Sequence, residues 1–136
     1  MLMEQGFALI PEFTLKTGRR ADLAAISTKG DFWIIEIKSS LADLRADTKW
    51  REYREFCDQF YFATHAGLPQ SYFPPEAGFI ISDAYGGAIL SPSPEHRLAA
   101  AARKALTLRF ARLAASRAMR AELGFQPDDF SLPDQP

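Results

Sequence analysis

The chain has 136 residues, a length typical of one domain rather than two. Hydrophobic residues make up 47% of it and charged residues 24%, which excludes a fully disordered chain and favours a globular protein. The formal net charge of −1 excludes a uniformly basic protein that coats DNA. The single cysteine excludes an internal disulfide, and with only two histidines beside it, carboxylates are the main candidates for metal ligands.

No apolar run approaches the ~18 residues that a membrane-spanning helix needs, and no signal-peptide pattern opens the sequence. We therefore expect a cytoplasmic protein that does not contact a membrane. Residues Leu2–Gly6 resemble the last turn of a helix closed by glycine, which suggests either that the natural chain continues upstream or that its start was misassigned.

The remaining pattern predicts strands first and helices between and after them. The expected strands cover Phe7–Leu15 (an edge strand interrupted by Pro11), Arg20–Ser27, Asp31–Lys38, Phe60–Thr64, Gly78–Ser82 and Ala88–Leu90. The expected helices cover Leu41–Cys57 and Leu98–Leu123. This order predicts an α/β (α+β) fold with a mixed central β-sheet flanked by helices, in one domain over residues 1–124 with a flexible tail over 125–136.

Three charged residues of the expected hairpin carry the clearest chemical signal. Glu36 and Lys38 are two residues apart on a strand and therefore point to the same face. A three-residue loop over Thr28–Gly30 would place Asp22 directly opposite Glu36, with Cβ atoms about 4.5–5.5 Å apart. A two-residue turn would instead put Asp22 on the other face, so the register decides whether the two carboxylates meet.

Two converging carboxylates beside a lysine suit Mg²⁺ or Mn²⁺ chemistry on a phosphodiester. Mg²⁺ takes oxygen ligands, commonly from one or two carboxylates together with waters and substrate phosphate. Lys38 could orient or deprotonate a water molecule, or stabilise charge that develops on phosphorus. The alternative is a surface ion pair at a strand end, which contributes little by itself. The same short pattern recurs at Asp47–Lys49, in an expected helix, where we treat it as a decoy.

With these residues identified, the chain resembles the PD-(D/E)xK nuclease superfamily, which has the restriction endonuclease-like fold. More narrowly, it resembles the bacterial MmcB-like DNA repair family. The matching stretches are GRRADLAAI, IIEIKSSLADLRADTKWREYREFCDQFYFA, EAGFIISDAYGGAIL and EHRLAAAARKALTLRFA. The long middle stretch is far more specific than the nuclease motif. One departure is Ala21, which stands where the superfamily motif often has proline before the aspartate.

The resemblance implies a DNA repair protein with a metal-dependent nuclease-like site. By the superfamily pattern, Asp22, Glu36 and the backbone carbonyl of Ile37 would bind the metal, and Lys38 would be the catalytic lysine. We expect these groups to converge in a cleft open to DNA. The alternative function is a repair module that keeps the nuclease fold and binds DNA structures without cleaving them. A homodimer is one further alternative for partners, although the sequence shows no dimer surface.

Several residues around this motif are candidates for contacts with DNA. Arg19 and Arg20 precede the Asp22 strand and could bind phosphate, although solvation in a turn explains them nearly as well. Lys49 and Tyr53 would share a face of the expected helix, with Lys49 on a phosphate and Tyr53 orienting substrate. The alternative is that neither residue contacts DNA, with Tyr53 in the core and Lys49 solvated at the surface.

A basic stretch near the carboxyl end is a weaker candidate for phosphate binding. Seven basic residues and no acid lie between Arg97 and Arg120. The pattern fits a helix that packs on one side and is soluble on the other, which is the better interpretation unless the helix borders the Asp22 site.

Overall fold

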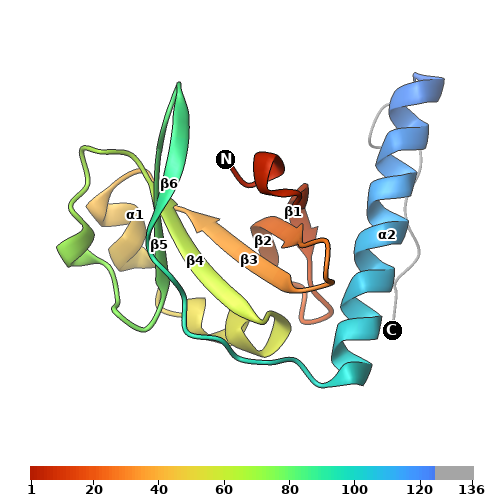
Figure 1. Cartoon of the computed structure of the whole chain (residues 1–136), viewed down its shortest axis with the longest axis horizontal. Coiled ribbons are helices and arrows are strands. Elements are labelled where there is room, and N and C mark those ends of the chain that lie inside the picture. The colour runs from red at the N-terminus through yellow and green to blue at the C-terminus, as the bar shows by residue number, and fades with distance from the viewer. Residues whose placement is uncertain (125–136) are drawn as a thin grey trace.

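The computed structural model describes residues 1–124, and a six-stranded sheet in the order β1-β2-β3-β4-β5-β6 forms its framework (Figure 1). The strands are β1 (Ala8–Thr14), β2 (Arg20–Ile26), β3 (Phe32–Ile37), β4 (Gln59–Thr64), β5 (Gly78–Asp83) and β6 (Gly86–Ser91). The β3–β4 and β4–β5 pairs are parallel and the other three are antiparallel. The predicted α+β class with a mixed sheet is therefore confirmed, while the expected tail over 125–136 lies outside the described residues.

Two α-helices and three short 3₁₀ segments accompany the sheet. They are α1 (Leu41–Ala46), α2 (Ala100–Leu123), η1 (Met3–Gln5), η2 (Trp50–Phe56) and η3 (Gln70–Tyr72). Within residues 1–124, no helix combines the length and apolar character needed to cross a membrane.

The single helix expected over Leu41–Cys57 is wrong. The chain leaves α1 at Asp47, whose backbone is extended (φ −87°, ψ 93°), and resumes as the 3₁₀ segment η2 after Lys49. A 3₁₀ helix has 3.0 residues per turn, so residues four apart do not share a face. Lys49 is accordingly exposed while Tyr53 is buried, and the predicted common face does not exist.

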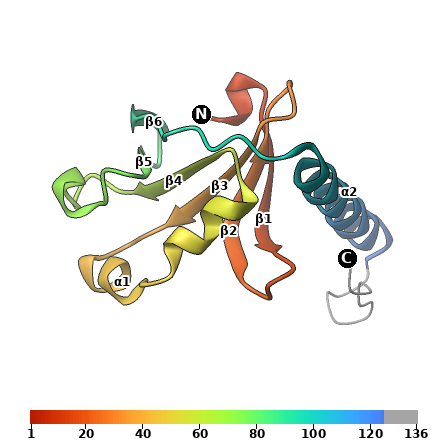
Figure 2. The same ribbon diagram turned by 90° about the horizontal axis from the view of Figure 1, so that it is seen from below.

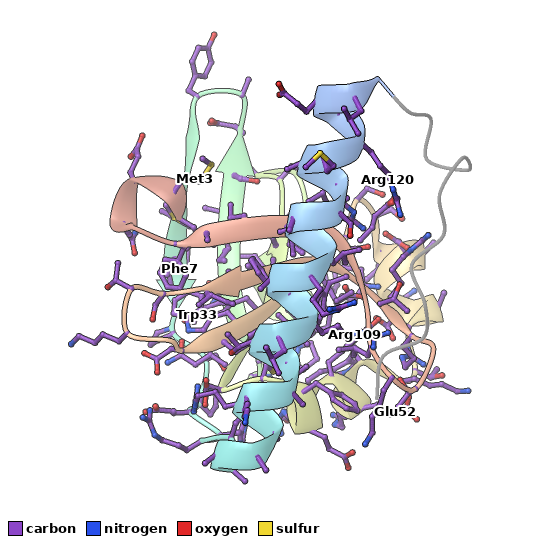
Figure 3. The ribbon with its side chains drawn as sticks, turned by 90° about the vertical axis from the view of Figure 1, so that its right-hand side faces the viewer. Met3, Phe7, Trp33, Glu52, Arg109 and Arg120 are labelled. Carbon is purple, nitrogen blue, oxygen red and sulfur yellow. The ribbon has the colours of Figure 1, made fainter. Side chains whose placement is uncertain are left out.

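The sheet carries a hydrophobic cluster on each face, and the two differ in size. The larger cluster is rich in aromatic rings and packs under η2 and α2, with Trp50 and Tyr53 against Phe60 and Phe62. The smaller cluster includes Leu2, Ile35 and Tyr61 beneath the N-terminal segment. Figure 2 shows η1 and η2 on opposite sides of the sheet. In Figure 3, Phe7 and Trp33 lie on the η1 side, away from Glu52 of η2.

The hairpin between β2 and β3 has the register that a three-residue loop predicts. Leu23 pairs with Ile35 and Ile26 with Phe32. The loop closes through a Ser27 N–H bond to the Asp31 carbonyl, and Gly30 takes the left-handed conformation (φ 87°) that glycine adopts without steric cost. One step beyond the Leu23–Ile35 pair, this register brings Asp22 opposite Glu36.

An irregularity in β1 and β2 falls at the level of Asp22. Ile10 and Phe13 are three residues apart yet belong to the same core cluster, and so do their partners Ala24 and Ala21. Residues three apart in a regular strand point to opposite faces, so both strands change their alternation between these pairs. Glu12, with φ 52°, is the one non-glycine residue of the described chain with positive φ. The distortion thus lies beside a candidate site residue, as is common at functional sites.

Helix α2 runs along the β1 edge of the sheet (Figures 1 and 3). Leu106 and Phe110 bury its inner side in the larger cluster. Arg109 donates to the carbonyl of Thr14, and Arg117 donates to the carbonyls of Pro11 and Glu12. Arginines of the basic stretch therefore bind the backbone of the edge strand, in keeping with the packed-helix interpretation.

Candidate functional site

Asp22 and Glu36 meet where the regular ladder between β2 and β3 ends. The Asp22 N–H donates to Oε2 of Glu36 at 2.7 Å, and the Ile37 N–H donates to Oδ2 of Asp22 at 2.8 Å. Each carboxylate therefore reaches across to the backbone of the other strand, and the two acids are fixed close together. Like charges this close repel each other unless a proton or a cation intervenes.

Burial makes Glu36 a weaker acid than an ordinary glutamate. Its residue surface is 6% exposed, and this burial raises its pKa to about 7. The neighbouring Asp22 charge raises the pKa further, whereas the Asp22 N–H bond and the Lys38 ammonium lower it. A carboxylate that gives up its proton near neutral pH can exchange that proton for a metal ion.

Lys38 is buried next to these acids and is held by Asp47. The Lys38 Nζ lies 2.8 Å from Oδ2 of Asp47, and both side chains are about one-tenth exposed (9% and 10%). The Lys38 backbone is also fixed, because its N–H donates to the Ala63 carbonyl and its carbonyl accepts from the Thr64 hydroxyl. In a continuous helix Asp47 would belong to the decoy motif Asp47–Lys49; the break after α1 instead leaves it paired with Lys38.

Tyr53 and Arg19 line the site from the η2 side. The Tyr53 hydroxyl donates to the Arg20 carbonyl at 3.1 Å, and the Arg19 guanidinium lies over the ring, 5.1 Å from its centroid. Burial and the nearby Glu36 carboxylate raise the pKa of Tyr53 to about 12, against the lowering effect of Arg19. Arg19 also bonds to Glu52 of η2 at 3.1 Å. Tyr53 is thus both a core residue and a neighbour of Glu36.

Two of the candidate DNA contacts remain at the surface. Arg20 and Lys49 are exposed and form hydrogen bonds through their backbone: the Arg20 carbonyl accepts from Tyr53, and the Lys49 N–H donates to Oδ1 of Asp47. The structure therefore places Tyr53 beside Glu36, Arg19 against Tyr53, and Arg20 and Lys49 at the surface.

The expected open cleft is only partly present. Glu36 and Lys38 are nearly covered, at 6% and 8% exposure, whereas Asp22 is half-buried and Ile37 is 51% exposed. Tyr53 of η2 lies next to Glu36, and Asp47 lies next to Lys38. Of the two acids, Asp22 is the more accessible.

His65 is a neighbour of the site that no sequence pattern pointed to. Its Nδ1 accepts the Gly67 N–H at 3.0 Å, so in the neutral ring Nε2 carries the proton that is donated to the Ser39 carbonyl at 2.9 Å. Histidine thereby ties the end of β4 to the residue that follows Lys38.

The donor set fits a hard dication in chemistry, although it is small. Within residues 1–124, no three acidic, histidine or cysteine side chains lie close enough to hold a metal ion together. Asp22 and Glu36 each use one carboxylate oxygen for a main-chain N–H bond and have a second oxygen. Two carboxylates with main-chain carbonyl and water ligands are a usual set for Mg²⁺.

A groove of about 470 Å³ lies next to the site, against the smaller hydrophobic cluster. Its lining is mostly apolar, with Leu23, Ile35 and Ile80 among the contributing residues. Ile37 and Lys38 also line the groove, whereas Asp22 and Glu36 do not, so the groove adjoins the site at the end of β3.

The comparisons with known proteins identify the family. The family described as "DNA repair protein MmcB-like" matches residues 1–124. A solved structure, a protein of unknown function from Silicibacter pomeroyi, is 36% identical with a TM-score of 0.86, covering 98% of this chain and 89% of that one. A comparison with curated proteins found no match. Since the family matches nearly the whole chain, this protein belongs to the MmcB-like family of DNA repair proteins.

Proposed function

We propose that this protein is a Mg²⁺-dependent nuclease of the PD-(D/E)xK type that hydrolyses phosphodiester bonds in DNA repair intermediates. One observation carries the proposal: Asp22 and Glu36 are locked together by reciprocal bonds to each other's strands, with the buried Lys38 beside them. Two carboxylates and an ammonium group that share one end of a sheet are the groups this reaction needs. Membership in a DNA repair family makes DNA the natural substrate.

Each residue has a defined part in the proposed reaction. Asp22, Glu36 and the Ile37 carbonyl would hold Mg²⁺ or Mn²⁺, which neutralises phosphate charge and acidifies water. Glu36 ionises near pH 7, so it can hold a cation at physiological pH. The Lys38 ammonium stabilises the negative charge that develops on the phosphate oxygens, or orients the attacking water.

The surface beside the acids supplies contacts for the DNA backbone. Arg20 and Lys49 are exposed there and can bind phosphates without breaking a side-chain bond that the structure records. Arg19 is held by Glu52, whose side chain is 56% exposed. Such surface pairs are worth about 0–1 kcal/mol, so a phosphate can displace Glu52 and bind Arg19. Tyr53, next to Glu36, would orient the bound strand.

The alternative is a module that binds DNA structures without cleavage. The low exposure of Glu36 and Lys38 favours it, because a scissile phosphate must reach both groups. In that case the acids would hold a metal that anchors a phosphate, and the same surface residues would bind the backbone.

A cleavage assay separates the two functions. Wild-type protein is incubated with single-stranded, flapped and branched DNA in the presence of Mg²⁺, Mn²⁺ or EDTA. We expect cleavage that needs the metal and falls at least ~100-fold in Asp22→Asn, Glu36→Gln and Lys38→Ala. Glu55→Gln is the matched control, because Glu55 is an exposed acid of η2 with no recorded contact to the site.

The outcomes have distinct meanings. Cleavage by wild type that survives in Asp22→Asn would place the activity elsewhere or in a contaminant. Tight binding of branched DNA without cleavage in either metal would replace the nuclease proposal with the binding module. Loss of phosphate contacts in Lys49→Ala should weaken DNA binding across sequences and reduce its salt dependence by about one ion.

A further inference from the structure

The Lys38–Asp47 ion pair has no role in the proposed reaction as described so far. Asp47 lies at the end of α1, nine residues beyond Lys38 in the chain, and its Oδ2 contacts the Lys38 Nζ at 2.8 Å. Its other oxygen accepts the Lys49 N–H at 3.2 Å, which fixes the carboxylate plane. The Asp47 carboxylate therefore holds the lysine from the side of the chain break between α1 and η2.

A lysine beside Asp22 and Glu36 creates a problem for any cation that those acids bind. The ammonium and the Glu36 carboxylate are near enough for their charges to interact. A flexible four-carbon side chain that is not otherwise held would form its ion pair with these acids, because they are the adjacent negative groups. The ammonium would then occupy the carboxylate oxygens that a metal ion needs.

We propose that Asp47 is a positioning residue that draws the Lys38 ammonium away from Asp22 and Glu36, so that the two acids stay free for a divalent cation and the lysine points toward the substrate. This inference rests on the proposed function for its catalytic consequence, but the placement of the lysine can be tested without cleavage. An ammonium group has three donors, so one bond to Asp47 leaves two for a phosphate oxygen or a water molecule.

The pair is better suited to this role than to stabilising the fold. Buried ion pairs rarely stabilise a protein more than apolar residues of the same size, because both charges lose their hydration. The Asp47 carboxylate also lacks the set of backbone donors that surrounds a structural acid, since its one recorded backbone bond comes from Lys49.

The test is a double-mutant cycle read by Mn²⁺ binding in calorimetry, with Mn²⁺ itself as the probe. We expect Asp47→Asn to weaken Mn²⁺ binding at least ~10-fold, the usual effect of removing a group that orients a metal site. Lys38→Met should bind Mn²⁺ at least as well as wild type. The double variant should match Lys38→Met, because the competing ammonium is gone. Glu55→Gln removes the same charge from an exposed position of η2 and should change binding less than ~2-fold.

Other results would overturn the inference. The loss of Mn²⁺ affinity caused by Asp47→Asn can be compared in the wild-type and Lys38→Met backgrounds. If the loss is the same in both, Asp47 acts only through its charge. If Asp47→Asn lowers the melting temperature and Lys38→Met does not restore binding, its role is structural. If wild type binds no Mn²⁺ at millimolar concentration, Asp47 protects no metal site.

Cleavage provides the second arm and separates the two proposals. In a protein that cleaves DNA, Asp47→Asn should lower kcat at least ~10-fold while KM for DNA stays within ~2-fold, since the lysine is misplaced but the DNA-binding surface is intact. If wild type binds Mn²⁺ and follows the predicted cycle but never cleaves, the proposed function fails and the positioning of Lys38 stands. If it cleaves while Asp47→Asn leaves kcat unchanged, the nuclease stands and this inference fails.

Discussion

The two ends of the β3–β4 pair each hold a buried acid bonded to a basic side chain, and the two acids differ in how fully they are bonded. At the amino end, Asp58 accepts from the N–H groups of Phe32 and Leu98 and from both terminal nitrogens of Arg103. At the carboxyl end, Asp47 has Lys38 and a single backbone N–H.

The difference in bonding distinguishes a structural acid from a functional one. All the main acceptor positions of Asp58 are filled, and its bonds join β3, β4 and the start of α2. Near Lys38, Asp22, Glu36 and Asp47 each accept one backbone N–H, and Asp47 alone is paired with the ammonium, so acceptor positions are left for a ligand. A buried carboxylate whose acceptor positions are all filled stabilises the fold. A group of carboxylates with unfilled acceptor positions can instead be stabilised by binding a ligand.

The largest effect should come from breaking the saturated pair. Asp58→Ala leaves the Arg103 guanidinium and two backbone N–H groups without their acceptor, and we expect the free energy of unfolding to fall by about 3–5 kcal/mol. Urea denaturation measures this loss. Arg97→Ala, which removes an arginine that is 68% exposed and paired with Asp31 and Glu95, should change stability by less than about 0.5 kcal/mol. Equal losses in the two variants would contradict the comparison.

Low pH should remove the stabilisation that Asp58 provides at the amino end of the β3–β4 pair. Burial alone would raise the pKa of Asp58, but the bonds from Arg103, Leu98 and Phe32 outweigh it and hold the pKa below the usual 3.8. A carboxyl whose pKa is lower in the folded state stabilises the fold above its unfolded pKa and loses that contribution as pH falls through the folded value. Unfolding free energy measured from pH 5 to pH 2 should therefore fall less steeply in Asp58→Asn than in wild type.

At the other end, neutralising an acid should not destabilise the protein. The pKa of Glu36 is raised from 4.5 to about 7 by burial, so above pH 7 its charge is an energetic cost to the metal-free fold. We expect Glu36→Gln to be more stable than wild type at pH 8 in EDTA, by about 1–2 kcal/mol, with the gain vanishing below pH 5. Thermal melts at both values of pH test this, and a loss of stability at pH 8 would make Glu36 a structural acid.

The smallest effect should be stabilisation by metal. A ligand that binds only the folded state at ten times its dissociation constant adds about 1.4 kcal/mol, so Mg²⁺ or Mn²⁺ should raise the melting temperature of wild type by a few degrees. Asp22→Asn should show no such rise, and neither should Glu36→Gln. An increase that persists in both variants would point to a cation site other than these acids.

The hairpin shows how much of the site the sequence could predict. Alternation along the strands and a glycine at the third loop position determine the β2–β3 register, and both are local properties. The approach of Asp22 to Glu36 follows from that register. The catalytic and metal-binding roles of these residues and of Lys38 remain predictions.

The break between α1 and η2 could not be predicted in the same way. Residues 41–57 have helical spacing of apolar side chains, but the chain leaves the helix at Asp47, whose carboxylate is paired with Lys38 nine residues earlier. Local helical preference is a weak guide where side chains make such contacts. The arginines of α2 were equally ambiguous, because their carbonyl partners in β1 are about a hundred residues away in the chain.

Those arginine bonds have a consequence for self-association. The outer edge of a sheet is a template on which another chain can add a strand, and proteins block it with proline, distortion or a covering helix. In β1 all three devices coincide: Pro11 lacks an N–H, Glu12 distorts the backbone, and Arg117 occupies the carbonyls of both. A second chain therefore cannot readily add a strand at β1. Aggregation by strand addition would have to start at the other edge strand, β6.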